Sequence, residues 1–222
     1  MIKKDSSQRI SNMNVSFSPT ICEDFLNKLD RKSGYEKLRK AAYNMGVPSL
    51  EENACTAVTN IVSIKQPKKS IDIGCGIGVS SMAVLKGCPE TNLTAVDGNL
   101  ERGLFFQNYY KDYKNVTYYQ MRGEQFLKTT DELYDFAFID TVKREYSAIW
   151  QLLRPRLNDK ACVIFDDILI YGYVMCQECE TPYKYQSNRR EVLNFINEIF
   201  DDETLNAQII PVNGGLLSIS LK

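Results

Sequence analysis

Short apolar runs alternate with amphipathic stretches through most of this chain, and that alternation restricts the fold more than any other feature. Five of the runs have the length and β-branched character of buried strands: SIDIG (70–74), NLTAVD (92–97), VTYYQ (116–120), YDFAFID (134–140) and ACVIFDD (161–167). The segments between them show helical spacing of apolar residues, at about 79–86, 100–113, 123–129 and 144–157. Because a crossover between parallel strands is usually a helix, the alternation predicts an α/β fold with helices on both faces of a mostly parallel sheet.

Further elements are expected on either side of this alternating region. Before it we expect a polar tail over residues 1–18 and helices over 19–65, the last of them over 50–64 with Ser49 as its N-cap. After it we expect a helix and a closing pair of antiparallel strands, which would bring the sheet to seven strands. These three elements are expected at 188–200, 206–212 and 215–221.

Length and charge restrict the class of protein. The 222 residues suffice for one domain with a sizeable core, expected over 19–222 with 66–222 as the α/β part. With 27 basic and 28 acidic residues the net charge is −1, so there is no general electrostatic case for binding nucleic acid. No run approaches the roughly 20 apolar residues that cross a bilayer. The N-terminus also lacks the apolar core of a signal peptide, and we expect a cytoplasmic protein without a membrane partner.

The chain contains no histidine, which limits its chemistry. Acid–base or metal chemistry must therefore use Asp, Glu, Lys, Tyr or Cys. Cys176 and Cys179 form a C-x-x-C, but a zinc site needs four ligands and the sequence has no second pair or histidine to complete it. Carboxylates are the better candidates for metal ligands.

Three alternate glycines follow the first strand, in the segment SIDIGCGIGVSS. Gly74, Gly76 and Gly78 indicate a turn in which a ligand lies close to the backbone. A nicotinamide-binding G-x-G-x-x-G would need glycine at position 79 or 81, where this chain has Val79 and Ser81. The spacing therefore favours a nucleoside ligand other than NAD.

Carboxylates follow several of the predicted strands. Asp97 ends the second strand, where it suits a carboxylate that accepts hydrogen bonds from both ribose hydroxyls. Asp140 ends the fourth strand, and Asp166 and Asp167 end the fifth. Neighbouring strands lie about 4.8 Å apart, so Asp140 and Asp166 could hold one cation if their strands are adjacent, with Asp167 as a third oxygen ligand. Such oxygen ligands suit Mg²⁺.

Several segments resemble a known family. The pattern from Asp72 to Gly78 resembles the first motif of class I S-adenosylmethionine-dependent methyltransferases. FIDTVKREY (138–146) and FDDILIYGYV (165–174) resemble the paired motifs of the cation-dependent O-methyltransferases, which include catechol and caffeoyl-CoA enzymes. The terminal IIPVNGGLLSISLK also resembles the closing hairpin of this family, so the resemblance covers about residues 47–222. It implies a Rossmann-like class I methyltransferase fold, with S-adenosyl-L-methionine and Mg²⁺ or another divalent cation as cofactors.

The resemblance also implies roles for individual residues. Lys143 would be the general base that deprotonates the substrate hydroxyl, acting beside Asp140. The metal ligands would be Asp140, Asp166 and Asp167. The family usually has Asn where this chain has Asp167, and the extra charge should bind Mg²⁺ more tightly while reducing its power to acidify a bound hydroxyl. The implied cofactor-binding residues are Leu50, Asp72, Gly74, Gly76, Gly78, Ser80, Asp97, Gly123, Glu124 and Asp140.

The substrate is left open by the sequence. The first interpretation is O-methylation of an aromatic or catechol-like small molecule. The alternative is O-methylation of tRNA 5-hydroxyuridine at the wobble position, because the segment from Val47 to Gly74, the Arg189/Arg190 helix and IIPV resemble a bacterial tRNA-modifying branch. A third interpretation is a non-catalytic S-adenosylmethionine-binding protein, which has no evident reason to keep the acidic cluster. The tyrosines between 171 and 185 are expected in a substrate-side lid, and the sequence does not decide whether the chain forms a homodimer.

Overall fold

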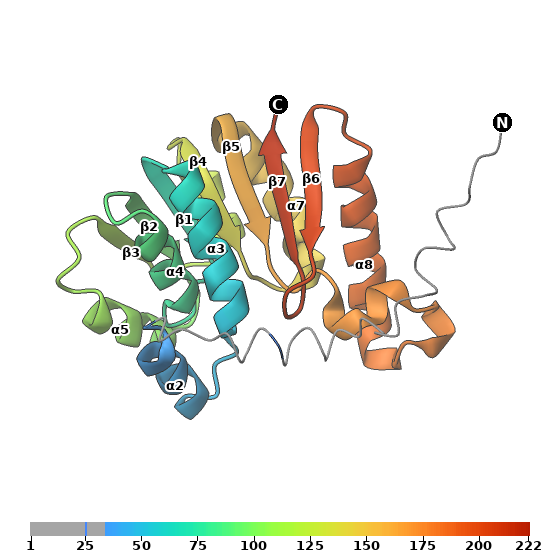
Figure 1. Ribbon diagram of the computed structural model, residues 1–222, viewed down its shortest axis with the longest axis horizontal. Coiled ribbons are helices and arrows are strands. Elements are labelled where there is room, and N and C mark those ends of the chain that lie inside the picture. The colour runs from blue at the N-terminus through green and yellow to red at the C-terminus, as the bar shows by residue number, and fades with distance from the viewer. Residues whose placement is uncertain (1–24, 26–33) are drawn as a thin grey trace. The chain divides into compact units, whose positions relative to one another are not determined.

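The computed structural model describes Phe25 and residues 34–222 (Figure 1). The chain divides into two units, Met1–Ser33 and Gly34–Lys222, and the second contains the sheet and the helices considered below. The predicted tail at 1–18, and the predicted helical residues from 19 to 33 apart from Phe25, lie outside the described residues.

Seven strands of the described part form one sheet, in the order β3-β2-β1-β4-β5-β7-β6. Their bounds are β1 (Lys69–Ile73), β2 (Asn92–Val96), β3 (Val116–Tyr119), β4 (Tyr134–Ile139), β5 (Leu157–Phe165), β6 (Leu205–Ile210) and β7 (Leu216–Leu221). Strands β1 to β5 pair in parallel, and β7 is antiparallel to both β5 and β6. The predicted seven-stranded, mostly parallel sheet is confirmed.

The strand order reverses between β1 and β4, which places a ligand crevice at their carboxyl ends. Strands β4 and β5 are neighbours, and Ile139 is paired with Phe165 at the ends of the two strands. Asp140 and Asp166 are the next residues in each strand, so the predicted adjacency of these two carboxylates holds at the level of the backbone.

Helices cover both faces of the sheet, as predicted. Figure 1 shows α3 and α4 in front of the sheet and α7 behind it. The helices of the described part are α2 (Glu36–Asn44), α3 (Glu52–Lys65), α4 (Val79–Gly87), α5 (Leu100–Tyr109), α6 (Gly123–Thr129), α7 (Tyr146–Leu153) and α8 (Tyr183–Phe200). Short 3₁₀ turns lie at η2 (Lys143–Glu145), η3 (Arg154–Arg156), η4 (Ile170–Met175) and η5 (Glu178–Glu180). None of the helices in the described part is both long and apolar enough to cross a membrane.

Four helix boundaries differ from the prediction, and one of them is the end of α5, at Tyr109 rather than at about 113. Helix α3 has Glu51 as its N-cap rather than Ser49, and no side chain caps it. The helix predicted over 144–157 is divided into η2, α7 and η3, and Pro155 stands in the last of these, where its missing N–H cannot continue the α-helical pattern. Helix α8 begins at Tyr183, directly after Pro182, so it includes residues that we had expected in the preceding segment.

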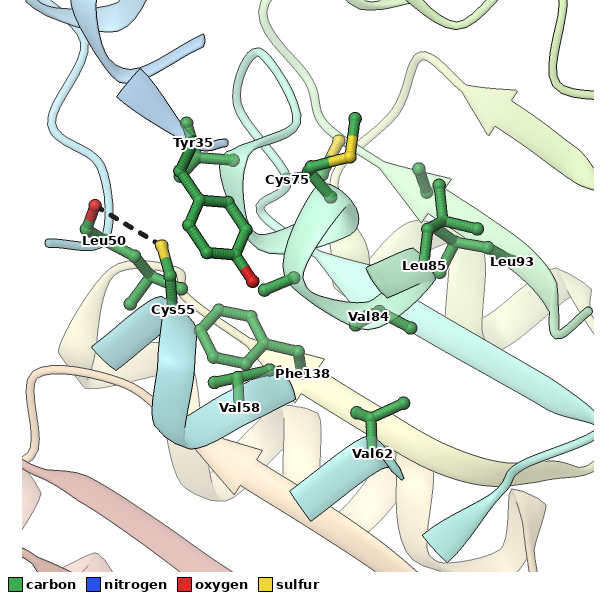
Figure 2. Close-up of a cluster of buried hydrophobic side chains, with 14 of the residues drawn as sticks. Tyr35, Leu50, Cys55, Val58, Val62, Cys75, Val84, Leu85, Leu93 and Phe138 are labelled. Atoms are coloured by element: carbon green, nitrogen blue, oxygen red, sulfur yellow. Dashed lines mark hydrogen bonds between the residues drawn. The ribbon is translucent and has the colours of Figure 1, made fainter. Parts of the chain in front are cut away.

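The core consists of two clusters, one on each face of the sheet. Successive residues of a strand point to opposite faces, so Phe138 of β4 belongs to one cluster and Ile139 to the other. On the first face Phe138 packs with Val58 and Val62 of α3 (Figure 2). Each such side chain contributes about 1.5–3 kcal/mol when it is fully buried. This two-sided packing holds the strand ends in place.

Candidate active site

A cavity of about 460 Å³ opens at the carboxyl ends of β1, β2 and β4. Its volume lies in the range of about 300–1,000 Å³ that is typical of small-molecule sites. Seven predicted cofactor-binding residues line it: Leu50, Gly74, Gly76, Ser80, Asp97, Gly123 and Asp140. The other predicted site residues stand outside the wall of this cavity: Asp72, Gly78, Glu124, Lys143, Asp166 and Asp167.

Asp97 is fixed by backbone groups at the wall of the cavity. Its Oδ2 accepts a hydrogen bond of 2.9 Å from the N–H of Gly76, and its Oδ1 accepts one of 2.8 Å from the N–H of Asn99. The Arg102 guanidinium lies 4.0 Å from Oδ2. Each carboxylate oxygen keeps further accepting capacity, so the side chain can accept from two neighbouring hydroxyls, as a ribose would supply.

The three glycines of the turn serve different purposes. All three have positive φ, but a Cβ on Gly74 would lie only 1.9 Å from the carbonyl oxygen of Asp140. Gly74 therefore lets the end of β1 approach the end of β4. A Cβ on Gly78 would meet the Tyr110 ring at 2.4 Å, and the Tyr110 hydroxyl donates to the carbonyl oxygen of Gly78 at 2.6 Å. The prediction that all three glycines contact the ligand thus fits Gly74 and Gly76 better than Gly78.

Asp72 is fully buried within β1 rather than at its end. Its Oδ2 accepts hydrogen bonds from the hydroxyls of Ser80 (2.7 Å) and Ser81 (2.5 Å). Its Oδ1 has no hydrogen-bond partner among the residues that the structure describes. Burial raises the pKa of Asp72 to about 7. A donor such as a ligand ammonium would satisfy Oδ1 and favour the carboxylate, so this residue fits the amino-acid portion of S-adenosylmethionine.

Near the start of α6, Gly123 and Glu124 differ in position. Gly123 lines the cavity, and a Cβ there would lie 2.2 Å from Cγ2 of Ile73, so this glycine also permits α6 to pack on β1. Glu124 instead forms an ion pair with Lys128 one turn along the helix. Arg122 and Gly123 both line the cavity, so Arg122 is a further candidate to contact a ligand, and the contact of Glu124 stays a prediction.

The sequence analysis missed three arginines that line the cavity, namely Arg102, Arg122 and Arg144. Two of them adjoin residues that we did predict, because Arg122 precedes Gly123 and Arg144 follows Lys143. A systematic consideration of the neighbours of each motif residue would have found these two. Arg102 lies in the first turn of α5 and adjoins no predicted site residue in the sequence, so no motif pointed to it.

Lys143 lies among the predicted metal ligands at the ends of β4 and β5. Its Nζ is 3.3 Å from Oδ1 of Asp140 and 3.4 Å from Oδ2 of Asp167. The same atom donates to the carbonyl oxygen of Asp166 at 3.3 Å and to the hydroxyl of Tyr146 at 2.8 Å. Only 12% of the Lys143 side chain is exposed. The structure thus brings together the four residues that the two sequence motifs singled out.

Negative charge is in excess at this cluster. Burial, reinforced by the charge of Asp140, raises the pKa of Asp166 to about 7. Burial also raises the pKa of Asp167, although the ammonium of Lys143 opposes the shift. Three carboxyl groups carry more negative charge than one ammonium can balance, and a further cation would reduce the repulsion between them.

The donor chemistry of this cluster fits a hard divalent cation, because it offers only oxygen ligands with excess negative charge. Within the described residues, however, no three acidic, cysteine or histidine side chains are arranged as a metal site. The ammonium of Lys143 lies between Asp140 and Asp167 in the present arrangement. A divalent cation therefore remains a proposal.

The tyrosine-rich segment after β5 is held against α8. The rings of Tyr173 and Tyr185 stack with centroids 5.1 Å apart, and Arg189 donates hydrogen bonds to the carbonyl oxygens of Tyr173 and Cys176. Tyr171 is 76% exposed. No residue of this segment lines the cavity, and its role as a lid stays a prediction.

Comparison with known proteins agrees with the fold. A family model described as O-methyltransferase matches residues 26–221. Tapetum-specific methyltransferase 1 of Arabidopsis thaliana is 28% identical over 180 residues, which are 78% of this chain and 76% of that protein. Probable caffeoyl-CoA O-methyltransferase 3 of Dictyostelium discoideum is 24% identical over 182 residues, which are 74% of this chain and 72% of that protein.

Solved structures share the fold at low sequence identity. The O-methyltransferase TomG from Streptomyces achromogenes, in complex with SAM, matches with a TM-score of 0.75 and 15% identity, over 86% of this chain and 91% of that chain. At this identity the likeness shows the fold alone. The family model spans well over half of the chain, and we conclude that the chain belongs to the O-methyltransferase family, with the class I fold of S-adenosylmethionine-dependent methyltransferases.

Proposed function

We propose that this protein transfers the methyl group of S-adenosylmethionine to a hydroxyl of an aromatic or catechol-like small molecule, with the help of a divalent cation. The observation that carries the proposal is the position of Lys143 beside the carboxylates of Asp140 and Asp167 and the backbone carbonyl oxygen of Asp166. A buried lysine in such a cluster is positioned to exchange a proton with a bound hydroxyl.

Binding of S-adenosylmethionine would use two parts of the cavity wall and Asp72, which lies outside the wall and is hydrogen-bonded to Ser80 of the wall. Asp97 would accept hydrogen bonds from the ribose hydroxyls, and Asp72 would offer its free Oδ1 to the amino group. Gly123 and Arg122 would contact the base. The cavity volume suits a ligand of this size.

The reaction needs a deprotonated oxygen in line with the methyl group. When bound, S-adenosylmethionine supplies a methyl group on a good leaving group, and a divalent cation at Asp140, Asp166 and Asp167 stabilises the substrate oxyanion. Lys143 accepts the hydroxyl proton at Nζ, which requires its amine to be neutral beforehand. Asp140 and Asp167 lie 3.3 and 3.4 Å from Nζ and keep it at the end of β4.

An aromatic substrate is supported by the apolar side chains near Asp140. Val142 lines the cavity and is 49% exposed, and Ile77 and Val79 also line it. An aromatic ring could lie against such side chains while its hydroxyl reaches Lys143. A relative named for caffeoyl-CoA, whose acyl group is a catechol, points the same way. The tRNA alternative has no support among the relatives named above.

A methyl-transfer assay tests this proposal. The protein is incubated with S-adenosylmethionine carrying a labelled methyl group and, separately, with catechol, caffeoyl-CoA or bulk tRNA. We expect label in catechol or caffeoyl-CoA, loss of transfer in excess chelator, and recovery when Mg²⁺ is restored. Label in tRNA alone would overturn the proposed substrate class, and full activity in chelator would overturn the cation requirement.

A further inference from the structure

Tyr146 is a fully buried tyrosine next to the predicted base. It is the first residue of α7 and has no exposed surface. Its ring packs against Phe165 of β5 and Phe195 of α8, with centroid distances of 5.0 and 5.8 Å. Two rigid neighbours therefore fix the ring and, with it, the position of the hydroxyl.

The hydrogen bonds of the Tyr146 hydroxyl have only one consistent direction. The hydroxyl is 2.6 Å from the carbonyl oxygen of Asp166 and 2.8 Å from Nζ of Lys143. A carbonyl oxygen cannot donate and an ammonium cannot accept, so the hydroxyl donates to Asp166 and accepts from Lys143. The phenol thereby links the end of β5 to the lysine of η2.

This link gives Lys143 an anchor that the carboxylates do not give. A lysine side chain is long and flexible, and fixing its rotamers is entropically costly. If Asp140 and Asp167 hold a cation, as proposed above, their oxygens are shared with it and hold Nζ less well. The Tyr146 hydroxyl is neutral and stays bonded to the backbone, so it can hold Nζ whether the lysine is charged or neutral.

We propose that Tyr146 is a positioning residue, whose hydroxyl holds Nζ of Lys143 at the end of β5 during methyl transfer. This inference rests on the proposed role of Lys143 as the base. If the hydroxyl had a purely structural role, its removal would lower the stability of the fold and leave kcat unchanged. Measurement of kcat therefore distinguishes the two roles.

Tyr146→Phe is the decisive variant, because it keeps the buried ring and removes only the hydroxyl. Tyr134→Phe is the matched control, since Tyr134 is buried in the same core cluster as Tyr146. Tyr134 begins β4, near Thr94 and Thr130, whereas Asp140 follows the other end of that strand. With catechol or caffeoyl-CoA as acceptor, we expect Tyr146→Phe to lower kcat about 10- to 100-fold, because small misplacements of a catalytic group have effects of this size. KM for S-adenosylmethionine should change less than about twofold, and Tyr134→Phe should keep its kcat.

Two further measurements locate the effect at Lys143. If Tyr146 acts through that residue, the double variant Lys143→Ala/Tyr146→Phe should be no slower than Lys143→Ala alone. A crystal structure of Tyr146→Phe should show Nζ of Lys143 no longer at hydrogen-bond distance from the carbonyl oxygen of Asp166. This structural measurement needs no substrate.

Each outcome separates the inference from the proposed function. Unchanged kcat in Tyr146→Phe, an unmoved Nζ, or independent losses in the double variant would overturn the positioning role while Lys143→Ala keeps its large loss of kcat. Normal turnover by Lys143→Ala would instead overturn the assignment of the base, and the role of Tyr146 with it.

Discussion

Replacing Gly74 and Gly76 separately by alanine tests the packing of the glycine turn. Both residues have positive φ, so an alanine at either position costs about 1–2 kcal/mol in backbone strain. At Gly74 the new Cβ would lie 1.9 Å from the carbonyl oxygen of Asp140, whereas at Gly76 its nearest neighbour would be Cγ1 of Val47 at 3.5 Å. The second contact is an ordinary one, so only Gly74→Ala adds an overpacking cost of about 1–3 kcal/mol.

Adding the strain and overpacking ranges, we expect the free energy of unfolding to fall by about 2–5 kcal/mol in Gly74→Ala and by about 1–2 kcal/mol in Gly76→Ala. The gain from a less flexible unfolded chain is the same for both variants and cancels in the comparison. Urea unfolding measures the difference of about 1–3 kcal/mol, which should lower the midpoint of Gly74→Ala by about 0.3–1.5 M relative to Gly76→Ala if m is about 2–3 kcal/mol/M. Equal midpoints, or a more stable Gly74→Ala, would refute the close contact between the turn and β4.

Three further predictions concern the site. Lys143→Ala should lower kcat about 10²–10⁴-fold while calorimetry shows unchanged binding of S-adenosylmethionine; normal turnover near neutral pH would remove the lysine from the mechanism. Asp166→Ala should abolish binding of Mn²⁺, used as a paramagnetic probe of the cation site and followed by its spin-resonance signal, and wild-type affinity in this variant would contradict the ligand assignment. The pKa of Asp72 is about 7 in the folded state against 3.8 in the unfolded chain. Between these two pH values the native state holds more protons than the unfolded state, so the free energy of unfolding falls as the pH rises, by at most about 4 kcal/mol. Asp72→Asn should therefore lose stability less steeply than wild type between pH 4 and pH 8 in urea unfolding, and parallel slopes would contradict the raised pKa.

The sequence predicted the sheet well because buried parallel strands are nearly continuous apolar runs. The main error is at β5, which begins at Leu157 rather than at 161. Its first residues include Asp159 and Lys160, which are exposed and lie where the β4–β5 register is interrupted, and Lys160 has a positive φ, so these residues carry no strand pattern. The start of α8 was placed late for a related reason, since Tyr183 to Ser187 are mostly polar or exposed and only Pro182 marks the boundary.

The candidate site was predictable where it depends on strand ends. Asp140 and Asp166 could be brought together from strand adjacency alone, and Lys143 from its place in the motif. The contact of Lys143 with Tyr146 could not be foreseen, because it depends on a 3₁₀ turn that folds the lysine back over the end of β5. Arg102 was missed because the tertiary arrangement alone brings its side chain to the cavity.

A crystal structure with S-adenosylhomocysteine and catechol would test the central claim most directly. We expect the ribose hydroxyls on Asp97, the amino group at Oδ1 of Asp72, and the sulfur facing a catechol hydroxyl at Lys143. A nucleoside bound outside this cavity, or a sulfur directed away from Lys143, would contradict methyl transfer at this site.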